Sequence, residues 1–229
     1  GSEMCIRDRY QEVQPLSRTR EKIEEVLEPS LVDEVAVYFD EMRRWGSEQD
    51  AQDYLTAVRA VYAHERRVNP DGPAELTRSF AAGLHKLSAY KDEYEVARLA
   101  LDPGFAEAQK GGKVTVQFQP PLLRSLGLNR KIGLGPRMRP LLSALAKAKG
   151  LRGTRLDIFG YAEVRKMERK LVNAYREEIL SRARNLHTLE QVAELTALAA
   201  AADGVRGFED KKIDSAQELL QKLGRAGVK

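Results

Sequence analysis

The stretch LRGTRLDIFGYAEVRKMERKLVNAYREEI, residues 151–179, sets the helical character of this chain. We expect a loop from Gly150 to Gly160, followed by a long helix from about Tyr161 to Arg184. Apolar residues recur in that helix at every third or fourth position, which predicts one buried stripe. The stripe consists of Val164, Met167, Leu171, Tyr175 and Ile179.

The same periodicity predicts helices on both sides of this stretch. Ser30 with Asp33, and Ser47 with Asp50, are placed as N-terminal caps. The turn-forming sequence NPDGP, residues 69–73, is a clear break. Further helices are expected from Pro29 to near Gly46, after Ser47, from Ala74 to about Leu101 with a kink allowed near Gly83 or Tyr90, from Arg139 to Lys149, from Leu189 to Ala202 after a Thr188 cap, and from Asp210 to Leu223.

Residues Lys113–Gln119 break the helical pattern. Polar and apolar side chains alternate there, which is typical of a strand with one buried face. A second short strand around Lys131–Leu134 is placed to pair with it. The expected fold class is therefore mainly α: a helical domain with a small two-stranded β ribbon near residues 113–134.

The first nine residues, GSEMCIRDR, match a reading-frame translation of a transposon-end sequencing adapter. We expect residues 1–9 to be an artefact and the chain to be a fragment of a longer protein. The remainder is expected to comprise N-terminal helices over residues 10–68 and a mostly helical C-terminal domain over residues 69–229.

The composition, 42% hydrophobic and 31% charged, is ordinary for a soluble globular protein. No apolar run approaches the roughly 20 residues that a membrane span needs. Cys5, the only cysteine, lies in the suspect segment, which leaves no disulfide, iron–sulfur cluster or cysteine nucleophile. We expect a cytoplasmic protein.

The net charge of +4 hides a strong asymmetry. Residues 1–120 carry 16 Lys and Arg against 22 Asp and Glu, residues 121–176 carry 14 against 3, and residues 177–229 carry 8 against 9. The basic middle indicates an acidic partner surface, a phosphate-bearing ligand or nucleic acid. It is equally consistent with a basic segment that packs beside the acidic first half.

Within the basic middle, a set of arginines lies away from the expected apolar stripe. Their planar guanidinium groups suit paired contacts with carboxylates, so we interpret them as candidates for docking an acidic partner. A solvated helix face that contacts nothing is the alternative. The candidates are Arg152, Arg155, Arg165, Arg169 and Arg176.

The sequence offers no catalytic, cofactor-binding or metal-binding residue that we would name. The histidines are far apart and lack the spacing of metal ligands: His64, His85 and His187. No glycine-rich phosphate loop and no nucleophile elbow is present. Three acidic residues beside Lys91 and Arg98 are interpreted as helix-surface ion pairs, with acid–base work left open. They are Asp92, Glu93 and Glu95.

Several stretches resemble the C-terminal region of fused indolepyruvate ferredoxin oxidoreductases, which belong to the 2-oxoacid:ferredoxin oxidoreductase family. They follow the family's order over most of the chain after about Tyr54: KLSAYKDEYEVARL (86–99), QPPLLRSLG (119–127), LGPRM (134–138), residues 151–179 and VRGF (205–208). Arg137 stands for the tryptophan of the family's FGPWM, Ile158 stands for the proline of DPFGY, and the polar run at 209–212 also differs. These departures leave the exact 2-oxoacid substrate open.

The resemblance implies a parent enzyme that decarboxylates an aryl 2-oxoacid with thiamine diphosphate, passes electrons through iron–sulfur clusters to ferredoxin, and forms an acyl-coenzyme A. The chain has no cluster-binding cysteines and no thiamine diphosphate signature, so that equipment is expected upstream. We therefore expect a structural or docking accessory domain, inactive alone, whose acidic partner is a neighbouring domain or ferredoxin. The alternative is a free-standing basic helical module that binds nucleic acid.

Overall fold

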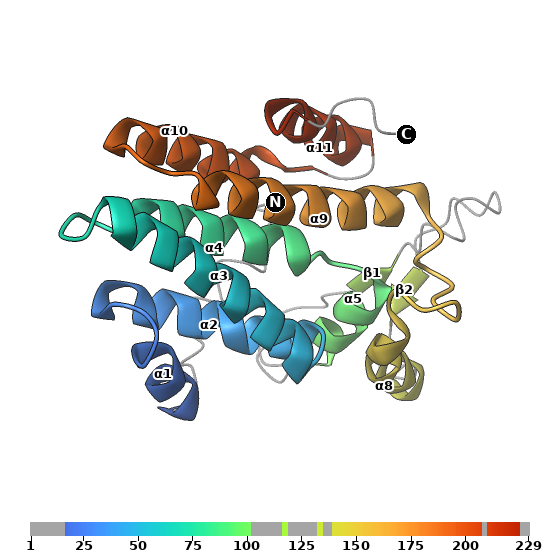
Figure 1. Cartoon of the computed structure of the whole chain (residues 1–229). Helices are drawn as coiled ribbons and strands as arrows, with labels where there is room; N and C mark the ends of the chain where they lie inside the picture. Colours follow the sequence, from blue (N-terminus) through green and yellow to red (C-terminus); the bar gives the residue numbers. More distant parts are fainter. Residues whose placement is uncertain (1–16, 102–115, 119–131, 135–138, 208–209, 225–229) are drawn as a thin grey trace, which may run out of the picture.

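The computed structural model describes residues 17–101, 116–118, 132–134, 139–207 and 210–224, and Figure 1 shows them as a bundle of helices. The expected artefact at residues 1–9 lies outside the described residues. The α-helices are α1 (Ser17–Glu24), α2 (Pro29–Trp45), α3 (Glu48–Val68), α4 (Glu75–Ser88), α5 (Glu93–Ala100), α8 (Arg139–Lys147), α9 (Glu163–Arg184), α10 (Leu189–Ala200) and α11 (Asp210–Lys222). Two 3-10 helices, η4 (Ala148–Leu151) and η5 (Ala201–Gly204), follow α8 and α10.

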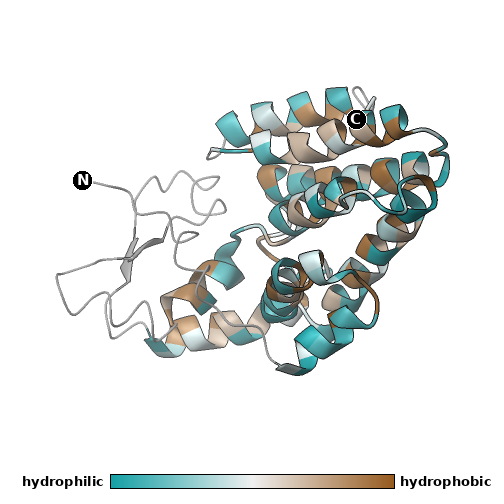
Figure 2. Cartoon of the chain, turned by 90° about the vertical axis from the view of Figure 1, so that its left-hand side faces the viewer, coloured by the Kyte–Doolittle hydropathy of each residue, from teal (hydrophilic) through white to brown (hydrophobic). Residues whose placement is uncertain are grey.

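Helix α4 lies at the centre of the bundle, where it contacts α2, α3, α9 and α10. Helix α9 packs against α4 on one side and α11 on another, while α10 contacts both α4 and α9 (Figure 1). Figure 2 shows hydrophobic and hydrophilic residues alternating around most helices, as expected of amphipathic helices. One hydrophobic core joins residues from both sides of the expected domain division at 68/69.

The centre of the core is an aromatic pair, Phe80 of α4 and Tyr175 of α9. Both side chains are fully buried, and their rings stack with centroids 5.7 Å apart. The Tyr175 hydroxyl donates a hydrogen bond to the Ala199 carbonyl (2.9 Å), so its polar end is satisfied inside the core. The predicted stripe on α9 is confirmed only in part: Leu171, Tyr175 and Ile179 are buried, whereas Val164 and Met167 are half-buried.

Two predicted helix starts are confirmed by capping boxes. Ser47 caps α3 and exchanges hydrogen bonds with Asp50, and Thr188 caps α10 and exchanges them with Gln191. In each box the side chains satisfy backbone N–H groups that a helix end leaves without partners. Local sequence alone specifies these two helix starts.

The predicted cap at Ser30 is wrong. Helix α2 begins at Pro29, and the Ser30 hydroxyl donates instead to Glu28 Oε1 (2.5 Å). Asp33, the expected partner of Ser30, pairs with Arg20 of α1 (2.8 Å). Proline is favoured in the first helical turn because its missing N–H is not needed there.

Helix α4 is capped from another helix. Ala74 precedes it and offers no side-chain cap, whereas Glu65 of α3 is fully buried beneath its first turn. The Glu65 carboxylate accepts hydrogen bonds from the backbone N–H groups of Leu76 (3.0 Å) and Thr77 (2.8 Å). A carboxylate at a helix N-terminus satisfies these donors and interacts favourably with the helix dipole.

The single helix predicted from Ala74 to Leu101 is two helices, α4 and α5. Helix α4 ends at Ser88, and Asp92 caps α5 by accepting a hydrogen bond from the Glu95 N–H (2.8 Å). Between them the Tyr90 carbonyl accepts a hydrogen bond from the Trp45 indole (2.9 Å). Distant side chains therefore stabilise the break.

The predicted two-stranded β ribbon is wrong as part of the fold class, because the described residues form a helical architecture with no sheet layer. The main core of the described residues is built from helices and their connections. The segments β1 (Val116–Phe118) and β2 (Ile132–Leu134) pair antiparallel, with Val116 opposite Leu134, but over three residues only. A pair this short adds no layer to the bundle. Much of the predicted strand Lys113–Gln119 lies outside the described residues.

Helices α5 and α8 pack against each other at one end of the bundle (Figure 1). Tyr94, Leu99 and Leu142 are buried there but lie outside the main core. The α5–α8 pair therefore depends on other contacts to hold it to the bundle.

Candidate functional site

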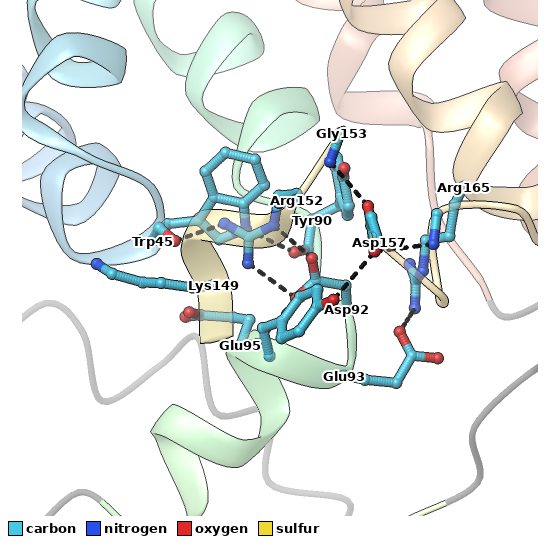
Figure 3. A network of polar contacts seen from close by, with 12 residues as sticks. Trp45, Tyr90, Asp92, Glu93, Glu95, Lys149, Arg152, Gly153, Asp157 and Arg165 are labelled. Atoms are coloured by element: carbon cyan, nitrogen blue, oxygen red, sulfur yellow. Dashed lines mark hydrogen bonds and ion pairs between the residues drawn. The ribbon is translucent and has the colours of Figure 1, made fainter. Parts of the chain in front are cut away.

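A network of polar side chains, which we call the junction, joins the start of α5 to the loop between η4 and α9 (Figure 3). Asp92 and Arg152 form its centre. Arg152 Nε donates to Asp92 Oδ2 (2.5 Å), and Arg152 Nη2 donates to Asp92 Oδ1 (3.0 Å). Both side chains are less than a tenth exposed, so this two-bond ion pair is buried.

The same arginine also holds the end of α2. Arg152 Nη1 donates to the Trp45 carbonyl (2.6 Å), and the guanidinium carbon lies 3.8 Å from the centre of the Trp45 ring. Tyr90 packs edge-on against Trp45, with ring centroids 5.2 Å apart. Arg152 therefore joins α2, the α4–α5 break and the η4–α9 loop.

Asp157 organises the η4–α9 loop. Its carboxylate is buried and accepts hydrogen bonds from the backbone N–H groups of Gly153 (2.8 Å) and Gly160 (3.0 Å) and from the Tyr94 hydroxyl (3.1 Å). Burial and the Asp157 charge raise the pKa of Tyr94, so its hydroxyl stays protonated and acts as the donor. Gly153 has a φ of +75°, a conformation that favours glycine.

A second buried charge cluster joins the first turns of α9 to α5. Arg165 Nη1 donates to Glu168 Oε2 (2.7 Å), and Arg165 Nη2 lies 3.5 Å from Glu93 Oε2. Lys212 of α11 pairs with the other Glu168 oxygen, whereas Glu93 Oε1 has no hydrogen-bond partner among the described residues. Burial raises the pKa of Glu93 in spite of the nearby Arg165.

The five candidate docking arginines do not form one exposed surface. Arg152 and Arg165 are unavailable to a partner because both are buried and paired with carboxylates of the acidic first half. Arg169 donates to the Gly160 carbonyl (2.6 Å), and Arg176 is half-buried. Only Arg155 is exposed. The described geometry therefore matches the alternative in which the basic middle packs against the acidic residues.

The buried acids were misplaced by sequence reasoning. The ion pair itself is confirmed for Glu95, which pairs with Arg98 (2.6 Å), although Glu95 is buried and not on the helix surface. The interpretation as helix-surface ion pairs is wrong for Asp92 and Glu93, which pair with arginines 60 and 72 positions away. Local charge spacing carried no signal for these partners. The Asp92 capping position at the start of α5 was the one local indication.

The described residues contain no group of three or more side chains placed to hold a metal ion. His85, one of the histidines considered, stacks on Tyr38 with ring centroids 4.5 Å apart. None of the helices in the described ranges combines the length and apolar character needed to cross a bilayer. Most polar groups of the junction form hydrogen bonds or ion pairs within the chain. The junction therefore has the geometry of a structural contact between helices.

Comparison with known proteins identifies a family and no individual relative. No curated protein and no solved structure was found to match the chain. A family of unknown function, DUF6537, matches residues 31–224, which include nearly all of the bundle core, the α5–α8 pair and the whole junction. The match spans well over half of the sequence, so the chain belongs to the DUF6537 family.

Proposed function

We propose that this chain is a C-terminal accessory domain of a cytoplasmic 2-oxoacid:ferredoxin oxidoreductase of the indolepyruvate type. Its role is to hold and dock parts of the parent enzyme, and it has no catalytic activity alone. One observation carries the proposal. The stretches at 86–99 and 151–179, which carry the resemblance to that family, meet at the junction.

The residues of these two stretches have architectural roles in the junction. Arg152 and Asp92 form the buried ion pair, and Asp157 holds the loop through Gly153 and Gly160. Removing one partner of a buried ion pair typically costs about 3–5 kcal/mol, because the other charge is left unpaired. Sequence constraints of this kind are expected from folding alone, which supports a structural domain over a catalytic one.

The exposed side of the η4–α9 loop supports docking. Leu156, Ile158 and Tyr161 are 69%, 55% and 59% exposed on a loop whose base is held by buried Asp157. Several exposed apolar residues close together in the sequence of one loop are typical of an interaction surface. Arg155 adds one positive charge beside them. This mixture favours a neighbouring domain of the parent enzyme over ferredoxin, whose weak encounters depend mainly on charge.

The nucleic-acid alternative has less support. Non-specific affinity for nucleic acid requires exposed Lys and Arg that neutralise phosphates. Arg152 and Arg165 form ion pairs within the chain. Phe159 packs edge-on against Tyr94 with ring centroids 5.3 Å apart. Fewer cations and stacking rings are therefore free for a nucleic acid strand.

The upstream sequence in the source genome is one test of the proposal. We expect the upstream DNA to encode a thiamine diphosphate signature and cluster-binding cysteines, either in the same reading frame or in an adjacent gene. An ordinary start codon near Tyr10, with no such region upstream, would overturn it.

A second test uses the intact parent enzyme and the variant Leu156→Ser with Ile158→Ser. We expect weaker association of this domain with the rest of the enzyme in limited proteolysis and size-exclusion chromatography. Leu189→Ser is the matched control, because Leu189 is also 61% exposed but lies at the start of α10. Equal behaviour of the loop variant and the control would exclude the loop as the docking surface.

A further inference from the structure

A cleft of about 390 Å³ opens beside the junction, between the end of α2, the start of α3, η4 and α9. This volume lies within the range of roughly 300–1,000 Å³ that is typical of small-molecule sites. Trp45, Tyr54 and Tyr90 give the cleft an aromatic lining. Four basic side chains also line it: Lys149, Arg152, Arg169 and Arg176.

The α9 wall of the cleft presents donors that the chain itself does not use. Arg169, Asn173 and Arg176 share one helix face, since residues three, four and seven positions apart lie one above another. In the part of the chain that the structure describes, Arg176 has no hydrogen-bond or ion-pair partner. Arg169 Nη2 is bonded to the Gly160 carbonyl, while Arg169 Nη1 is buried without a partner.

Lys149 supplies a further positive charge from η4. Its Nζ donates to the backbone carbonyls of Arg44 (2.6 Å) and Arg43 (3.4 Å), and no carboxylate of the described residues forms an ion pair with it. Burial, followed by the positive charges of Arg152 and Arg98, lowers the pKa of Lys149. An anion in the cleft would relieve this crowding of positive charge.

Two carboxylates, Asp50 and Asp53, also line the cleft, but neither forms an ion pair with its basic side chains in the described residues. Asp50 accepts the hydrogen bonds of the α3 capping box from Ser47, and Asp53 accepts one from Gln49 (2.8 Å). Among the described residues, the carboxylate that Arg152 contacts is Asp92, which lies outside the lining. Lys149, Arg169 and Arg176 thus remain as cations that no carboxylate of the described residues pairs with.

We propose that this cleft binds a small phosphorylated molecule, with its phosphate against Lys149, Arg169 and Arg176 and its remaining part over the aromatic lining. A phosphate group offers several strong acceptor oxygens, which match donors from separate side chains, and arginine and lysine are its usual partners. The site is independent of the parent enzyme proposed above. Failure of either proposal therefore leaves the other standing.

The test is a titration of the full 229-residue chain with inorganic pyrophosphate at constant ionic strength. Trp45 is the single tryptophan of the chain and lines the cleft, so its fluorescence reports binding there directly. We expect a saturable fluorescence change and a rise in Tm, because a ligand that binds only the folded state stabilises it. No saturable change would overturn the proposal.

Arg176→Gln and Lys170→Gln form the matched pair of variants. Both remove one positive charge from α9, but Lys170 does not line the cleft. Loss of a charged hydrogen bond weakens binding by about tenfold or more, so Arg176→Gln is expected to do this while Lys170→Gln leaves the affinity unchanged. Equal weakening by both would mean that pyrophosphate only screens the basic surface, which overturns the site.

Citrate, a ligand with carboxylates in place of phosphates, is titrated in the same way for comparison. Binding of citrate more tightly than pyrophosphate would overturn the choice of phosphate. Far-ultraviolet circular dichroism checks that Arg176→Gln is folded. If it is not, Arg176→Lys and Asn173→Ala take its place, and both are expected to weaken pyrophosphate binding relative to Lys170→Gln; unchanged affinity in both would overturn the site.

Discussion

Two buried carboxylates near Arg165 have opposite energetic roles. Glu168 is satisfied on both oxygens, by Arg165 (2.7 Å) and by Lys212 of α11. Glu93 faces Arg165 at 3.5 Å with one oxygen and leaves the other without a partner. A buried carboxylate with incomplete bonding is destabilising in its charged form. Glu168 therefore stabilises the fold, whereas ionised Glu93 opposes it.

Glu93→Gln is expected to leave stability at pH 7 unchanged or to raise it. Burial raises the folded-state pKa of Glu93 above its ordinary 4.5, so the folded chain holds the proton more tightly than the unfolded chain. This contribution to stability is present below pH 4.5 and is lost as the pH rises through the folded-state pKa. The glutamine variant cannot lose this contribution, because it does not ionise. By linkage, its free energy of unfolding in urea, relative to the original chain, should therefore rise from about pH 4 to about pH 7.

Glu168→Gln is the control for this comparison, because it removes the same charge from a carboxylate with full bonding. It should destabilise the chain at pH 7 by about 3–5 kcal/mol, the typical effect of breaking a buried ion pair. If Glu93→Gln destabilises the chain as strongly as Glu168→Gln, the assignment of opposite roles is incorrect.

At the scale of elements, the close approach of α4 to α9 and η5 depends on Gly83. A Cβ atom at this position would lie 2.3 Å from Tyr175 Oη and 2.9 Å from the Ala202 Cβ. The Tyr175 ring is fully buried and its hydroxyl is bonded to the Ala199 carbonyl, so moving the ring aside would cost packing and hydrogen-bond energy. Glycine at this helical position is therefore required by packing.

Gly83→Ala has two opposing effects on stability. The higher helix propensity of alanine favours the variant by about 1 kcal/mol. Overpacking of a filled core typically costs about 1–3 kcal/mol, and the contact with Tyr175 is backed by a second contact with Ala202. We expect net destabilisation, measured as a lower Tm. Tyr175→Phe removes the clashing hydroxyl, so Gly83→Ala should cost less in that background; an equal cost would locate the strain elsewhere.

Helix ends were predicted correctly from the sequence where the capping residues are close in sequence to the helix start. The starts of α3 and α10 were predicted correctly, since Ser47 and Thr188 find their capping partners three residues on. The start of α4 depends on Glu65 from another helix, and the α4–α5 break depends on Trp45 and Arg152. Periodicity cannot detect such distant partners, so the sequence predicted one helix where there are two.

At the scale of the whole molecule, the junction connects the α5–α8 pair to the bundle. From the sequence, Arg152 and Arg165 were assigned to an external acidic partner, whereas in the structure both pair with carboxylates of the same chain. A count of charges cannot distinguish a solvated cation from a buried one, because burial depends on which segments meet in the fold. Their acidic partners, Asp92 and Glu93, lie in the first half of the chain. The same limit applies to the β ribbon, since alternation over a few residues does not predict how far a strand pairing extends.

The central claim is that residues 86–99 and 151–179 are held together through the buried Asp92–Arg152 pair. A double-mutant cycle of Asp92→Asn and Arg152→Gln, followed by urea unfolding, tests it most directly. The bonds of Arg152 to Trp45 are lost in both Arg152 variants and therefore cancel in the cycle. The exposed Glu178–Arg182 pair on α9, at 2.8 Å, is the control, expected to show a coupling of about 0.5 kcal/mol or less. For Asp92 and Arg152 we predict a coupling of about 1–3 kcal/mol; additive effects, no larger than in the control pair, would contradict the account.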